Sequence, residues 1–151
     1  MHILIDPLTG PEIHALLQEH VQDMVKHSPA HSMHARDLAA LRQPDITFWT
    51  AWEQGALLGC GALKALGAGA GEIKSMRTAS GHLRKGVAAA LMQRIMTTAR
   101  ERAYRQLYLE TGSAPAFDPA RRMYEGLGFA YCGPFASYVE DRFSVFMVKA
   151  L

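Results

Sequence analysis

A strand, a helix and a second strand follow one another within residues 72–111, and this succession most constrains the fold of the chain. Strands are expected at residues 72–78 and 106–111. Between them, residues 85–102 carry apolar side chains at helical spacing, so that they form one stripe. The succession implies two parallel strands joined by a right-handed crossover.

The flanking segments predict antiparallel strands and further helices. Thr9 and Glu12 have capping-box spacing, and the apolar stripe of the helix that follows includes His20. The glycine-rich run 67–71 predicts a flexible loop, and because it precedes a strand rather than a helix it lacks the context of a nucleotide-binding loop. The predicted elements outside the crossover are strands at 2–6, 46–53, 56–64 and 143–149, and helices at about 10–27, 33–41 and 118–127.

Together these elements predict a single α+β domain over residues 1–151. Its sheet is mixed and mostly antiparallel, with one parallel crossover and helices on both faces. Such a sheet leaves one ligand-sized opening where the strand direction switches.

Charge and hydropathy exclude several functional classes. A net charge of +2 argues against a dedicated nucleic-acid partner, which usually requires a marked basic patch. The chain has no apolar run of membrane-spanning length, and Asp6 and Pro7 interrupt the first residues too early for a signal-peptide core. We therefore expect a cytoplasmic protein with no membrane partner.

No metal site is predicted. The two cysteines, Cys60 and Cys132, form no CxxC pair. Pro29 interrupts the only histidine series, residues 27, 31 and 34, whose spacing could otherwise align ligands on a helix. From that series, His34 is a candidate for lining an acceptor pocket, with a plain surface loop as the alternative.

The segment 84–91 is the strongest candidate for binding an anion. Gly86 and Ala88 leave the start of a helix unobstructed, where free backbone N–H groups and the macrodipole attract a phosphate. Arg84 and Lys85 add positive charge beside it. An ordinary helix start with two solvated basic residues is the alternative.

Three segments in this order resemble the GCN5-related N-acetyltransferases. They are Glu72-Ile73-Lys74-Ser75-Met76-Arg77-Thr78, Arg84-Lys85-Gly86-Val87-Ala88, and Tyr124-Glu125-Gly126-Leu127-Gly128-Phe129. The resemblance covers nearly the whole chain and is nearest to the bacterial YsnE-type branch. Leu83 departs from the family pattern, which usually has Gln or Arg three residues before the central glycine.

The resemblance implies an enzyme that uses acetyl-coenzyme A as co-substrate. Main-chain groups of Met76, Arg77 and Thr78 are then expected to hold the pantetheine arm. The expected pyrophosphate site comprises Arg84, Lys85, Gly86, Val87, Ala88 and Ala89.

Two residues are candidates for moving protons. Glu72 is the candidate base for an amine, and its alternative role is an ion pair with Lys74, which lies on the same face of the strand. Tyr124 is the candidate acid for the departing thiolate, and its alternative role is core packing.

The acceptor is the least constrained part of the prediction. Trp49 and Trp52 lie on opposite faces of one strand, and Trp49 is a candidate for lining the acceptor cleft. We expect acetyl transfer to the amine of a small molecule. The alternatives are an acyl-coenzyme A sensor without turnover and an enzyme acting on protein or peptide amines. The apolar C-terminal region could also support a homodimer.

Overall fold

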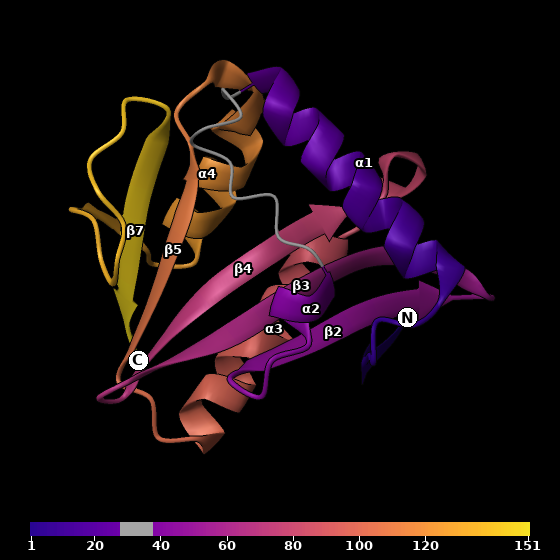
Figure 1. Ribbon diagram of the computed structural model, residues 1–151, viewed down its shortest axis with the longest axis horizontal. Coiled ribbons are helices and arrows are strands. Elements are labelled where there is room, and N and C mark those ends of the chain that lie inside the picture. The colour runs from indigo at the N-terminus through magenta and orange to yellow at the C-terminus, as the bar shows by residue number, and fades with distance from the viewer. Residues whose placement is uncertain (28–37) are drawn as a thin grey trace.

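The computed structural model describes residues 1–27 and 38–151, which form a seven-stranded sheet with helices on both faces (Figure 1). The strand order is β1-β2-β3-β4-β5-β7-β6. The strands are β1 (His2–Ile5), β2 (Ile46–Glu53), β3 (Ala56–Gly67), β4 (Ala70–Thr78), β5 (Gln106–Gly112), β6 (Ala130–Cys132) and β7 (Ser144–Ala150). The helices are α1 (Pro11–His27), α2 (Leu38–Leu41), α3 (Val87–Glu101) and α4 (Asp118–Gly126).

The predicted crossover is confirmed. β4 pairs with β5 in parallel, α3 joins them, and the other neighbouring strands in the sheet pair antiparallel. The predicted α+β class with a mixed sheet is therefore correct. Within the described residues, no helix is both long and apolar enough to cross a membrane.

One local prediction was wrong and one strand was missed. The glycine-rich run 67–71 is mostly strand, because β3 and β4 extend to a tight turn at Ala68 and Gly69, both of which have positive φ. The three-residue strand β6 was not predicted. The first part of the helix expected at 33–41 lies outside the described residues.

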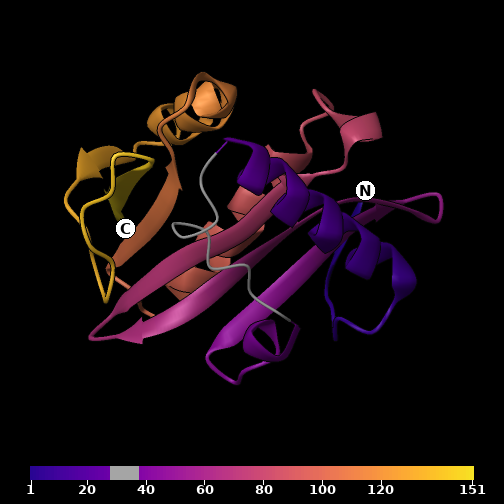
Figure 2. The ribbon, with the colours of Figure 1, turned by 45° about the horizontal axis from the view of Figure 1, so that its top comes forward.

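Two hydrophobic clusters occupy opposite faces of the sheet (Figure 2). The larger cluster joins α3 and α4 to one face, and Trp49 belongs to it with 2% of its surface exposed. The smaller cluster joins α1 and α2 to the other face. The predicted role of Trp49 in an acceptor cleft is therefore wrong, because its indole packs in the core beneath α3.

The parallel ladder between β4 and β5 ends early. Its registered pairs run from Ala70↔Gln106 to Ile73↔Leu109, although both strands continue beyond these residues. At Ser75 the backbone takes a φ of 55°, and the register with β3 shifts nearby. A bulge of this kind bends a strand and increases its twist. The ends of β4 and β5 consequently face each other without a ladder between them.

Candidate active site

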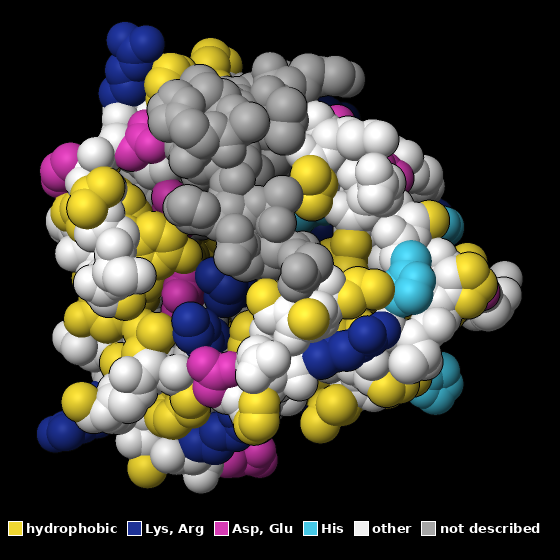
Figure 3. All heavy atoms as spheres, in the orientation of Figure 1, with side chains coloured by type: hydrophobic (Ala, Val, Ile, Leu, Met, Phe, Trp, Pro, Cys, Tyr) yellow, Lys and Arg dark blue, Asp and Glu magenta, His cyan; other side chains and the backbone are white. Residues whose placement is uncertain are grey.

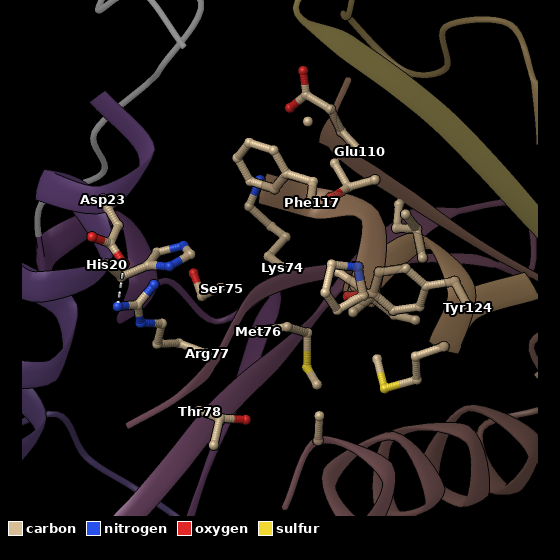
Figure 4. A pocket seen from close by; sticks show the side chains of 18 of the residues that line it. His20, Asp23, Lys74, Ser75, Met76, Arg77, Thr78, Glu110, Phe117 and Tyr124 are labelled. Atoms are coloured by element: carbon tan, nitrogen blue, oxygen red, sulfur yellow. Dashed lines mark hydrogen bonds and ion pairs between the residues drawn. The ribbon is translucent and has the colours of Figure 1, made fainter. Parts of the chain in front are cut away.

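A cavity of about 720 Å³ lies where β4 and β5 part. Its walls come from α1, α4, both parted strands and the loop before α3. The close-up shows side chains from these elements around one space (Figure 4). On the surface, acidic and basic side chains lie side by side near the middle of the face seen in Figure 3.

The cavity brings together most of the residues predicted from the sequence. Those that line it are Glu72, Met76, Arg77, Thr78, Arg84, Ala88 and Tyr124. Lys85, Gly86, Val87 and Ala89 are near neighbours in the loop and first helical turn but are not part of its lining. Trp49 lies elsewhere, in the core, and His34 falls outside the described residues.

The start of α3 forms one end of the cavity. Gly86 is the N-cap with a φ of 79°, and Arg84 before it also has a left-handed φ of 64°. The first helical hydrogen bond runs from the Ala90 N–H to the Gly86 carbonyl at 3.0 Å, and no side chain in the described chain caps the helix. The earlier amides of the first turn are therefore available to an anion.

The loop before α3 differs from the family pattern at Leu83. Leu83 lines the cavity and is 59% exposed, so it offers an apolar contact where the family pattern has a polar one. Lys85 extends toward His82, with 3.1 Å between Nζ and Nδ1, and only Arg84 of the two predicted cations lines the cavity. We therefore assign the positive charge at this end of the cavity to Arg84 and the helix N-terminus.

Glu72 lies deep in the cavity wall, where the two strands part, with 2% of its surface exposed. The Tyr138 hydroxyl donates to Glu72 Oε2 at 2.6 Å. Lys74 Nζ donates to the same oxygen at 3.3 Å, and it also lies 3.3 Å from the Tyr138 hydroxyl. The ion pair foreseen as an alternative is therefore present, and it lies in the cavity rather than on the surface.

Sequence reasoning missed Tyr138, which comes from the loop between β6 and β7. Its ring packs against Phe135 and Phe146, with centroids 5.0 and 5.6 Å away. This aromatic cluster fixes the hydroxyl over β4, although 66 residues separate Tyr138 from Glu72 in the chain. A single aromatic residue in a loop gives no periodicity from which this contact could have been found.

Tyr124 reaches the cavity from α4. It is 5% exposed, belongs to the larger core cluster and packs edge-on against Phe129 with centroids 5.8 Å apart. Burial raises the pKa of its phenol well above the ordinary value. Tyr124 therefore packs in the core and also lines the cavity, so its position is compatible with both roles considered for it.

A second group of polar side chains lines the α1 side of the cavity. One Arg77 nitrogen donates to Glu19 at 2.8 Å and to Asp23 at 2.6 Å. His20 lies beside Arg77 (Figure 4). Burial and the Arg77 charge lower the His20 pKa to about 4, although Asp23 opposes this shift. His20 is therefore neutral at neutral pH. The sequence showed it only as one member of a helical stripe.

The charged residues of the lining carry both signs. Arg84 and the N-terminus of α3 supply positive charge at the loop before α3. The other charged lining residues are Asp23, Glu72, Glu110, Lys74 and Arg77, which are three carboxylates and two cations. The lining therefore offers an anion site at the start of α3 and carboxylates elsewhere that can attract a cation.

Comparison with known proteins identifies the family. Residues 13–129 match the model of the acetyltransferase (GNAT) family, which is most of the chain. The chain belongs to the GNAT family. Its members are acetyltransferases, so the predicted enzyme class is confirmed.

Two relatives match this GNAT chain over nearly their whole length. The uncharacterized N-acetyltransferase YsnE of Bacillus subtilis (strain 168) is 56% identical over 151 residues, covering 100% of both chains. The uncharacterized N-acetyltransferase YedL of Escherichia coli (strain K12) is 44% identical, covering 99% of this chain and 94% of its own. The predicted resemblance to the YsnE branch is thereby confirmed.

Solved GNAT structures share the fold. A Klebsiella pneumoniae protein assigned as an acyl-CoA N-acyltransferase superposes with a TM-score of 0.80 at 27% identity, covering 99% of this chain and 97% of that one. A Bacillus subtilis acetyltransferase solved in complex with CoA superposes with a TM-score of 0.71 at 17% identity, covering 99% and 98%. At this identity the second likeness concerns the fold, and the CoA belongs to that protein.

Proposed function

We propose that this chain is an acetyl-CoA-dependent N-acetyltransferase that acts on the amine of a small molecule. One observation carries the proposal. The parting of β4 and β5 places an uncapped helix N-terminus and a buried carboxylate, Glu72, in the walls of a single cavity. An anion-binding end and a proton-accepting residue are the two features that acetyl transfer from a coenzyme A thioester to an amine requires.

The residues present fit coenzyme A. Beyond Ile73, β4 pairs only with β3 among the described strands, so within this part of the chain its edge at Met76–Thr78 faces the cavity without a strand partner. An extended, amide-containing arm can bind such an edge as an added strand does. At the end of the cavity, the amides of Val87, Ala88 and Ala89 and the guanidinium of Arg84 suit the pyrophosphate.

When bound, the cofactor supplies an activated acetyl thioester, so the chain mainly orients the acceptor and moves protons. Both hydrogen bonds that described side chains make to Glu72 end on Oε2. Oε1 is therefore the oxygen assigned to receive the proton of the amine, directly or through water. Tyr138 and Lys74 fix the orientation of the carboxylate during this step.

Tyr124 is assigned the opposite proton movement. Burial raises the pKa of the phenol, so it is protonated at neutral pH and can donate a hydrogen bond to the thiolate as it departs. Its place in the core limits the motion of the ring. The three carboxylates of the lining, Asp23, Glu72 and Glu110, favour an amine, which is cationic near neutral pH, over an anionic acceptor.

Calorimetric titration with acetyl-CoA tests the cofactor assignment. Ala88 lines the cavity in the first turn of α3, so Ala88→Asp should abolish saturable binding by placing a carboxylate against the pyrophosphate. Gln93→Glu adds a carboxylate to the same helix at an exposed residue that does not line the cavity, and should retain binding. An acidic residue in a first turn favours the helix, and glutamate forms helix as well as glutamine does, so both variants should fold. Gly86 is a poorer choice, because its φ of 79° strains any side chain.

Thiol release with a panel of amines tests the reaction. Glu72→Gln should lower kcat by about 100-fold or more while acetyl-CoA binding persists. If the wild type binds acetyl-CoA but turns over no amine, the sensor alternative is favoured. If the folded wild type does not bind acetyl-CoA, the proposed function is wrong.

A further inference from the structure

Lys74 places a primary amine inside the cavity, beside the residue assigned as the base. Among the lysine side chains that the structure describes, it is the one in the cavity lining, and 20% of its side chain is exposed. Its Nζ lies 3.3 Å from Glu72 Oε2 and 3.3 Å from the Tyr138 hydroxyl. Figure 4 shows the Lys74 side chain extending from β4 into the space that the lining residues surround. The chain therefore holds an amine of its own against its proton acceptor.

The order of the site along β4 directs the thioester toward this lysine. The start of α3, assigned to the pyrophosphate, comes after the end of β4 at Thr78, and the edge proposed for the pantetheine arm runs back from Thr78 to Met76. An arm that begins at the helix start and follows this edge points its far end, which carries the acetyl thioester, toward Ser75 and Lys74. Two extended residues span at most about 7 Å, so the Lys74 backbone lies within that distance of Met76.

Lys64 provides the contrast. It is the register partner of Glu72 across β3 and β4, but it does not belong to the cavity lining. Lys85 extends toward His82 from the loop before α3 and is exposed. A position inside the cavity, rather than closeness to Glu72 along the sheet, is therefore what distinguishes Lys74 from these two lysines.

We propose that the protein acetylates its own Lys74 when acetyl-CoA is bound and no acceptor amine occupies the cavity. This inference rests on the proposed use of acetyl-CoA. The Lys74 ammonium gives one proton to Glu72 Oε2 along the existing hydrogen bond, which leaves a nucleophilic amine. The nitrogen then bonds to the thioester carbonyl carbon and the carbon–sulfur bond breaks. A second proton passes from the nitrogen to the departing thiolate, so the products are an amide, the thiol of CoA and a proton that Glu72 releases to water.

Mass spectrometry with acetyl-CoA that carries a heavy-isotope acetyl group tests the proposal. The full chain, shown by its intact mass to carry no acetyl group, is incubated without any amine, and the label at each lysine is followed with time. We expect Lys74 to be labelled about tenfold or more faster than Lys64 and Lys149, because binding holds its amine and the thioester together. These two lysines are also half-buried but lie outside the cavity lining.

Two results of this experiment would overturn the proposal. Equal labelling of the three lysines would show that the thioester reacts with them without help from the site. A labelling rate per chain that rises with protein concentration would show transfer between molecules, whereas transfer within one molecule does not depend on concentration.

Variants test which parts of the site are responsible. Glu72→Gln keeps the shape of the side chain but removes the proton acceptor, and should slow the labelling of Lys74 by about tenfold or more. Ala88→Asp, designed to exclude the cofactor, should reduce it to the level of Lys64. Lys64→Arg changes the register partner of Glu72 outside the cavity, and should leave the labelling of Lys74 at the wild-type rate. Wild-type labelling of Lys74 in both cavity variants would contradict the proposal.

Calorimetry with acetyl-CoA and thiol release with amines separate this inference from the proposed function. If the chain binds acetyl-CoA and turns over amines but does not label Lys74, this inference is wrong and the proposed function stands. If Lys74 is labelled although no amine is turned over, the inference stands and the small-molecule acceptor is wrong. If the folded chain does not bind acetyl-CoA, both are wrong.

Discussion

The buried neutral His20 makes the stability of the fold depend on pH, and replacing it with Phe measures that dependence. The pKa of His20 is about 4 in the folded chain, against 6.5 for an unperturbed histidine. Between these values the unfolded chain binds a proton that the folded chain does not. The His20 contribution to stability is therefore fully present above pH 6.5 and decreases as the pH falls toward 4.

The magnitude follows from the shift. One pKa unit corresponds to about 1.4 kcal/mol. At pH 5 the solution is about one and a half units below the unperturbed histidine pKa of 6.5, and the folded chain has hardly begun to bind the proton. The free energy of unfolding should therefore fall by about 2 kcal/mol more in the wild type than in His20→Phe between pH 8 and pH 5. The difference between the two proteins removes the contribution of all other titrating groups, provided that these groups behave alike in both.

Urea unfolding at the two pH values provides the assay. The fluorescence of the two tryptophans reports the transition, since Trp49 is buried in the core. An NMR titration of the His20 ring gives an independent reading. Parallel losses of stability in the two proteins, or a His20 signal that titrates near 6.5, would show that the imidazole is not held neutral by burial and by Arg77.

Three further predictions concern the sheet, the thiols and the phenol. Gly59→Ala should destabilise the chain by about 1–3 kcal/mol in urea unfolding, because a Cβ there would lie 2.7 Å from the Arg77 carbonyl oxygen and 2.8 Å from a Val87 methyl group. Gly126→Ala meets nothing within 4 Å and should be neutral, so an equal loss in both would refute the steric argument. A thiol reagent should modify Cys132 first and Cys60 only as the chain unfolds, since burial raises the Cys60 pKa to about 12; simultaneous labelling would contradict this. In the thiol-release assay, Tyr124→Phe should lower kcat by about 100-fold, equally from pH 6 to pH 9, because the raised pKa keeps the phenol protonated throughout that range. A loss confined to one side of that range would indicate that another group is the acid.

The features that could be predicted from the sequence are those that depend on the local conformation of the backbone. The helix start after Gly86 could be predicted, because glycine and alanine leave amides open at a position that the helical stripe fixes. The parallel crossover followed from the order of its elements alone. Glu72 could be placed on the strand that leads into this loop, although its burial and its partners could not.

What remained hidden depends on contacts between distant parts of the chain. Tyr138 reaches Glu72 only because β7 pairs with β5 and carries its preceding loop back over the cavity. His20 has the spacing of a core residue on α1. The sequence does not indicate that the His20 ring borders a cavity, because this depends on the bulge of β4 at Ser75 and on Arg77 beyond it. Trp49 was assigned to the wrong environment because alternation along a strand gives two faces without saying which of them is covered by which helix.

Because the ladder between β4 and β5 is short, the sheet consists of two halves, β1–β4 and β5–β7, that few backbone pairs connect. Along the backbone, they are joined by the pairs from Ala70↔Gln106 to Ile73↔Leu109. The N–H groups of Arg105 and Gln106 also donate to the Gly69 carbonyl, at 2.6 and 3.3 Å. A molecule bound in the gap contacts both halves and thereby adds contacts across the parted ends of β4 and β5. Binding at a hundredfold excess over Kd adds about 2.7 kcal/mol to the free energy of unfolding. The melting temperature of the protein therefore reports how fully the site between β4 and β5 is occupied, and it allows ligands to be ranked without any knowledge of the acceptor.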